Sequence, residues 1–135
     1  MKSKTVTLIL YILGGYHFAT GIMAYFLTNF FYDNFTAHTG PLNSHFLADV
    51  GAAYLTAGAA LLMGAFVAKW RVPFAVSALM FLGLHSLIHI TEMVTGKLSS
   101  QQAVSDVVTV ILPAAFVALM IFLTLKMAKK EADAD

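Results

Sequence analysis

The chain has no cysteine and very few charged side chains. Without cysteine it can form no disulfide bond, thiolate nucleophile, iron–sulfur cluster or cysteine-ligated zinc site. Charged residues make up 11% of its 135 residues, whereas soluble domains carry about 25%. The net charge is only +1, which excludes the strong basic field typical of nucleic-acid-binding proteins.

Apolar residues fill the place of the missing charges. They account for 59% of the chain, and the mean hydropathy is +0.79. A chain this short cannot bury so much apolar surface in its own core, so the lipid bilayer is the expected partner. Continuous apolar runs without alternation favour helices over strands. We expect helices at about 5–32, 45–68, 72–95 and 103–126, followed by a charged tail over 127–135 that frays in water.

The predicted fold is all-α: a single-domain, integral membrane four-helix up-down bundle. Each apolar run is long enough to cross about 30 Å of hydrocarbon, and the first exceeds the usual length of a cleaved signal sequence. Cationic residues favour the cytoplasmic side of a membrane. In a bundle with four spans, Lys97 lies on one side. The other side holds the cations Lys2, Lys4, Lys69, Arg71, Lys126, Lys129 and Lys130. Both termini are therefore expected in the cytoplasm.

Ionisable residues gather in the half of the expected bundle remote from the termini. His85, His89 and Glu92 are spaced i, i+4 and i+7, which places them on one helix face. His45 and Asp49 share a face of the second helix. Such groups are costly in a membrane and usually face a bundle interior. Imidazoles and carboxylates suit zinc, iron or copper, so these five residues are the predicted metal ligands.

Other interpretations of the polar residues remain open. Asp106 is expected to cap the fourth helix more often than to bind a metal, and the alternative is that it completes the metal's ligands or orients a histidine. His17 and His85 lie at similar depths on two helices and could bind a b-type haem for electron transfer. A protein without a cofactor would be an assembly subunit or a proton- or solute-handling bundle. A metal site would suit a metal-dependent oxidoreductase or hydrolase, and neither the catalytic residues nor enzymatic activity can be assigned.

Small residues are frequent in the first two expected helices. They allow helix backbones to approach closely, so a second copy or another membrane protein is an expected partner through these faces. Pro113 falls within the fourth expected helix and should kink it, because proline lacks the N–H that the helix requires.

Two motifs carry a resemblance to known proteins. Residues 40–54 follow the pattern G-P-x-N-x-H-F-x-x-D-x-G-x-A-Y, and residues 84–89 follow L-H-x-L-x-H. With these motifs, most of the chain resembles a family of small bacterial four-helix inner-membrane proteins. The resemblance implies a multi-pass protein of the bacterial inner (cytoplasmic) membrane, and it implies no particular activity.

Overall fold

The computed structural model describes residues 3–133 and is helical almost throughout. Four helical stretches are long and apolar enough to cross a membrane: Lys4–Phe26, Ser44–Phe66, Ala68–Val94 and Ser100–Ala132. The elements, in chain order, are α1 (Ser3–Phe26), α2 (Thr28–Phe31), η1 (Tyr32–Thr36), η2 (Ala37–Thr39), α3 (Ser44–Phe66), η3 (Ala68–Trp70), α4 (Arg71–Val94), α5 (Ser100–Asp106), η4 (Val107–Ile111) and α6 (Leu112–Ala132). Within residues 3–133 no strand is present, as predicted.

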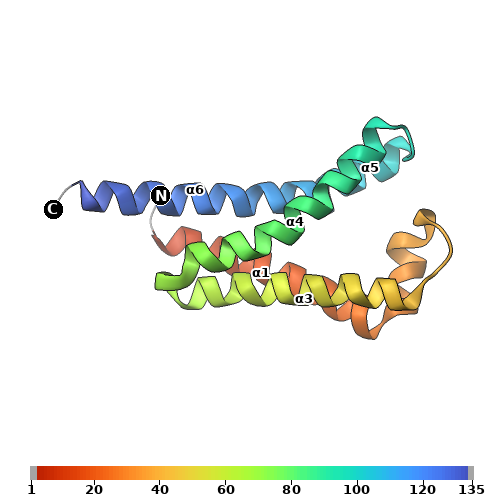
Figure 1. Ribbon diagram of the computed structural model, residues 1–135, viewed down its shortest axis with the longest axis horizontal. Helices are drawn as coiled ribbons and strands as arrows, with labels where there is room; N and C mark the ends of the chain where they lie inside the picture. The colour runs from red at the N-terminus through yellow and green to blue at the C-terminus, as the bar shows by residue number, and fades with distance from the viewer. Residues whose placement is uncertain (1–2, 134–135) are drawn as a thin grey trace.

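Successive long helices run in opposite directions along the molecule (Figure 1). The start of α1, the end of α6 and the link between α3 and α4 lie at one end, here called the terminal end. The segment from α2 to η2 and the helix α5 lie at the opposite end, here called the loop end (Figure 1). There α4 and α5 diverge from α1 and α3. Lys2, used above for orientation, lies outside the described residues, as do residues 134–135 of the predicted tail.

Helices α1 and α3 are in direct backbone contact. A Cβ atom added at Gly58 would lie 2.4 Å from the backbone nitrogen of Phe18, and one at Gly21 would lie 2.5 Å from that of Leu55. No side chain fits at such distances, so glycine is required at this contact. Four glycines form it, two from each helix: Gly14, Gly21, Gly51 and Gly58.

This contact changes the expectation for a partner. The glycine face was predicted to attract a second copy or another protein, but within this chain α1 and α3 cover it with each other. Gly15 points away from the contact and has no atom within 4 Å of its added Cβ. The described residues therefore provide no free glycine groove on α1 or α3 at this position.

The helix ends follow local sequence rules. Asn43 caps α3, since its Oδ1 accepts a hydrogen bond from the backbone N–H of Phe46 at 3.2 Å. Gly96 follows the end of α4 with a positive φ of 70°, a backbone conformation that favours glycine. Its N–H donates to Met93 and that of Lys97 donates to Glu92, which is the Schellman pattern.

Helices one and four differ from their predicted bounds. α1 ends at Phe26 rather than near residue 32, because Leu27 leaves the helical conformation with φ −120° and ψ 44°. The Thr28 hydroxyl then donates to the carbonyls of Ala24 and Tyr25. The fourth helical stretch begins at Ser100, capped by Ser99 through a capping box with Gln102. The expected cap of the fourth helix, Asp106, is therefore wrong. α6 continues to Ala132, so the described part of the tail is helical.

The terminal half of the molecule has an apolar core of fully buried side chains. Val6, Leu10, Leu61 and Val117 have no exposed surface there. At its edge Arg71 is 5% exposed and donates to the Thr7 hydroxyl at 2.7 Å and to the Gly64 carbonyl at 3.3 Å. A cation near the last carbonyls of a helix is favourable, so Arg71 stabilises the end of α3.

Candidate functional site

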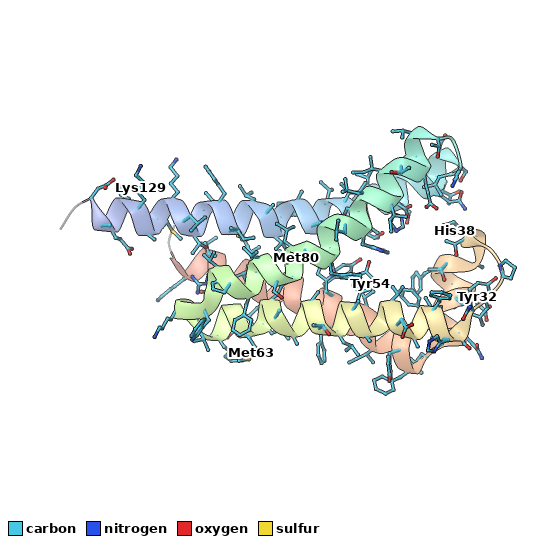
Figure 2. All side chains as sticks on the ribbon, in the orientation of Figure 1. Tyr32, His38, Tyr54, Met63, Met80 and Lys129 are labelled. Atoms are coloured by element: carbon cyan, nitrogen blue, oxygen red, sulfur yellow. The ribbon has the colours of Figure 1, made fainter. Side chains whose placement is uncertain are left out.

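A cavity of about 820 Å³ lies toward the loop end of the molecule. Its walls come from α1, the 31–43 segment, α3, α4, α5 and η4, so all four long helical stretches contribute. Tyr32 and His38 line it far from Lys129, and Tyr54 lines it near the middle of the molecule (Figure 2). The volume is within the range of about 300–1,000 Å³ typical of small-molecule sites.

One wall of the cavity carries a hydrogen-bonded chain of three ionisable side chains. Asp106 Oδ2 lies 2.6 Å from His89 Nδ1, and His89 Nε2 lies 3.2 Å from His85 Nε2. All three residues line the cavity. The side chains of His89 and Asp106 are only 17% and 10% exposed. The i, i+4 spacing on α4 brings the two imidazoles together, and α5 supplies the carboxylate.

The hydrogen bonds determine which protons this chain can hold. An ionised Asp106 only accepts, so His89 Nδ1 must donate to it. If His89 is neutral, its Nε2 accepts from His85 Nε2–H, which leaves His85 Nδ1 as a bare acceptor. If His89 is cationic, its Nε2–H donates to His85, whose own proton then sits on Nδ1. One added proton therefore converts His85 Nδ1 from an acceptor into a donor.

His85 Nδ1 is the free end of the chain. Its ring makes the described hydrogen bond through Nε2, and within residues 3–133 no partner is present for Nδ1. His85 also lines the cavity, and its Nδ1 is not among the fully buried nitrogens without a partner, so a bound molecule can reach this nitrogen. A proton taken up at His85 Nδ1 can be balanced by the Asp106 carboxylate through His89.

The Pro113 kink predicted from the sequence takes the form of a π-helical turn, η4, directly before the proline. Pro113 has no N–H to donate to a carbonyl of the preceding turn. The hydroxyl of Tyr16 on α1 supplies a donor to this turn, bonding the Thr109 carbonyl at 2.8 Å. Ser86 on α4 bonds the Val110 carbonyl at 3.4 Å. These bonds hold α5 and Asp106 against α1 and α4.

Replacing Tyr16 with phenylalanine is expected to destabilise the protein by about 1–2 kcal/mol, because the Thr109 carbonyl loses the hydrogen bond from the Tyr16 hydroxyl. The control is Tyr25→Phe on the same helix, whose hydroxyl makes no described hydrogen bond. Unfolding free energies measured in mixed micelles compare the two. Equal costs would show that the Tyr16 hydrogen bond contributes no stability.

His17 lies behind the cavity wall. It is 1% exposed, and within the described residues both of its ring nitrogens are buried without a hydrogen-bond partner. Its ring stacks on Tyr54 at 5.6 Å between centroids, and Tyr54 contacts the His85 ring at 5.5 Å. Tyr54 lines the cavity and His17 does not. An iron bound by both His17 and His85 would therefore require Tyr54 to move.

The structure does not bring the five predicted metal ligands together. His45 and Asp49 pair at 3.5 Å with side chains 86% and 64% exposed, and neither lines the cavity. Glu92 lines a separate shallow pocket with Lys97. Within residues 3–133, no group of three or more histidine, aspartate or glutamate residues is arranged to hold a metal ion.

Sequence reasoning gave Asp106 mainly another role and missed Tyr16. Asp106 was interpreted as a helix cap, but it lies beyond the first turn of α5, 7% exposed and bonded to His89. Tyr16 was not singled out at all. Pro113 was the residue that could have pointed to it. A proline inside a membrane helix leaves a backbone carbonyl without its N–H donor, and a side chain of another helix can supply one.

Comparison with known proteins gives no relative. No protein-family model matches the chain, and neither a curated protein nor a solved structure shows significant similarity to it. The function must therefore be argued from the cavity and its polar wall.

Proposed function

We propose that the protein is a four-helix, up-down membrane bundle with both termini in the cytoplasm. The four apolar helical stretches support a bilayer environment. The lysines and the arginine at the terminal end support the orientation, which places the cavity on the opposite side of the membrane. The resemblance in residues 40–54 and 84–89 favours the bacterial inner membrane.

The proposed function is to bind a small molecule in the cavity and exchange a proton with it. The observation that carries this proposal is the chain from Asp106 through His89 to His85 on the cavity wall. A carboxylate that bonds the far nitrogen of an imidazole orients the ring and balances the imidazolium that forms on proton uptake. The free His85 Nδ1 is then the atom that gives or takes the proton.

The apolar terminal half argues against a continuous pore. A proton or solute crossing the membrane needs polar groups or water along its whole path. The fully buried Val6, Leu10, Leu61 and Val117 offer neither. A vestibule open to one side of the membrane is the arrangement that this distribution of polar residues favours.

Cysteine substitution tests the cavity and its orientation, because the native chain has no cysteine. Ser105→Cys, on the cavity wall, is expected to react with a membrane-impermeant thiol reagent added outside intact cells. Thr56→Cys, exposed on α3 but outside the cavity, should stay unreactive in lipid. Lys129→Cys should react only after permeabilisation. Protection of Ser105→Cys in intact cells, or labelling of Lys129→Cys there, would contradict the proposal.

A metal-binding function is the second candidate. The 3.2 Å between the Nε2 atoms of His85 and His89 is close to the spacing of two ligands around one tetrahedral ion. Asp106 would orient His89, as carboxylates commonly orient metal-bound imidazoles. The remaining positions would face the cavity, where zinc, iron or copper could meet a substrate.

Elemental analysis of the purified protein separates the candidates. The metal function predicts a near-stoichiometric transition metal that is lost in a folded His85→Ala, His89→Ala variant and retained in His45→Ala. Metal-free protein, even after loading with zinc, iron or copper, rejects it and leaves the proton-exchange proposal. An absorption spectrum tests the haem alternative, which requires a Soret band that His17→Ala abolishes.

A further inference from the structure

The cavity is lined by aromatic rings from several elements. They come from α1, α2, η1 and α3 and are Tyr16, Phe31, Tyr32, Phe35, Phe46 and Tyr54. Aromatic side chains offer flat apolar faces and polarised edges, which contact other planar rings favourably in stacked or edge-on geometry. A planar aromatic body is therefore better matched to these walls than a flexible chain.

The charge of the lining excludes an anion. Among the described residues that form the cavity there is no lysine or arginine. The carboxylate of Asp106 is already bonded to His89 at 2.6 Å, and the other polar lining groups are hydroxyls, amides and the ring of His38. A carboxylate or phosphate on the ligand would be buried without a cationic partner, which is costly. The ligand is therefore not an anion, and because His89 already occupies the Asp106 carboxylate, a cation would also lack a free counter-charge, so an uncharged ligand fits best.

The free nitrogen of His85 determines the polar group of the ligand. The protonation state of the hydrogen-bonded Asp106, His89 and His85 side chains decides whether His85 Nδ1 accepts or donates a hydrogen bond. A ligand hydroxyl can donate to a bare Nδ1 or accept from a protonated one. An ether oxygen only accepts, so it can bond His85 only when Nδ1 carries a proton. A ligand hydroxyl thus keeps its hydrogen bond to His85 in either state.

We propose that the cavity binds an uncharged aromatic alcohol of the phenol class, with its ring among the aromatic side chains and its hydroxyl on His85 Nδ1. This inference rests on the proposed function, since it names the class of molecule that meets the proton-exchanging chain. The cavity of about 820 Å³ has room for a ligand with more than one ring.

Protection of Ser105→Cys from a thiol reagent tests the ligand class in bilayer nanodiscs. The probes are 2-naphthol, its methyl ether, 2-naphthoate and 1-decanol, compared at equal concentrations in the membrane. The expected result is that 2-naphthol slows labelling most, by tenfold or more at saturation. The methyl ether should bind about tenfold more weakly, and 2-naphthoate should not protect.

Two variants identify the contacts. His85→Phe keeps a ring beside Phe81 and Tyr54 but removes the nitrogens, so it should abolish the preference for 2-naphthol over its methyl ether. His45→Phe, outside the cavity, is the matched control and should keep that preference. Phe35→Leu, at an exposed part of the lining, should weaken 2-naphthol and leave 1-decanol unchanged.

Failure of the inference is distinguishable from failure of the proposed function. Equal protection by 1-decanol, or strong protection by 2-naphthoate, would overturn the phenol class while the cavity still binds a ligand. No protection by any probe would also overturn it. The proposed function itself fails if unliganded Ser105→Cys cannot be labelled in intact cells, if Lys129→Cys is labelled there, or if ¹⁵N NMR shows that His85 and His89 do not change protonation together.

Discussion

Replacing His89 with alanine is expected to destabilise the protein by about 3 kcal/mol, among the largest effects of any side-chain truncation in the chain. The change leaves the Asp106 carboxylate, 10% exposed, without its described partner. Removing Asp106 as well eliminates the group that is left unpaired. The His89→Ala, Asp106→Ala double variant should therefore be more stable than His89→Ala alone, as measured by unfolding in mixed micelles.

The chain offers its own control for this comparison. His45 and Asp49 form a second histidine–aspartate pair, but their side chains are 86% and 64% exposed. Exposed pairs contribute little, so His45→Ala should change the unfolding free energy by no more than about 0.5 kcal/mol. If the costs of His89→Ala and Asp106→Ala simply added in the double variant, the two side chains would not be coupled.

The second large effect is expected at Gly58. In Gly58→Ala the new methyl carbon would lie 2.4 Å from the backbone nitrogen of Phe18, with the Gly14 carbonyl at 2.9 Å. Neither atom belongs to a flexible side chain, so α1 and α3 must move apart. We expect a loss of about 3 kcal/mol, the upper part of the usual range for overpacking.

Gly15→Ala provides the matched control, since it makes the same substitution in the middle of α1. Its added methyl meets nothing within 4 Å. Alanine is the better helix former by about 0.5–1 kcal/mol, so this variant should be as stable as the native protein or more stable. A Gly58→Ala protein that matches Gly15→Ala in stability would contradict the close contact of α1 and α3.

Much of the helical framework was predictable from the sequence. Apolar runs located the four long helical stretches, and Asn43 and Gly96 marked helix ends because their local chemistry determines the backbone there. The end of α1 at Phe26 was missed. The Thr28 hydroxyl can bond backward along the helix without breaking it, and the sequence does not show which outcome occurs.

The site was predictable only within one helix. His85 and His89 are four residues apart on α4, so their contact follows from helix geometry alone. His45 and Asp49 were placed at the correct end but on the wrong face. The rotation of α3 about its axis is set by glycine contacts with α1, and it turns Phe46, Val50 and Tyr54 toward the cavity instead.

Contacts between distant helices explain the remaining errors. Asp106 resembled a capping residue because the true cap, Ser99, lies seven residues earlier. Its partner His89 is on another helix, and no local pattern connects the two. Tyr16 and Thr109 are 93 residues apart, and their hydrogen bond follows only once α1 is known to lie beside the π-helical turn.

The central claim is that His85, His89 and Asp106 act as one unit that gains or loses a single proton. ¹⁵N NMR of histidine-labelled protein in lipid bilayers observes this directly, because protonated and bare ring nitrogens have different chemical shifts. His85→Phe and His89→Phe variants assign the signals. The exposed His38 and His45 serve as references in the same sample.

The hydrogen bonds predict a coupled change on acidification. His89 should begin with its proton on Nδ1 and become doubly protonated, and in the same step the proton of His85 should move from Nε2 to Nδ1. Asp106→Asn should uncouple the two changes. If His85 keeps its proton on Nε2 while His89 titrates, or if the two rings titrate separately, the proposed proton-exchanging chain is wrong.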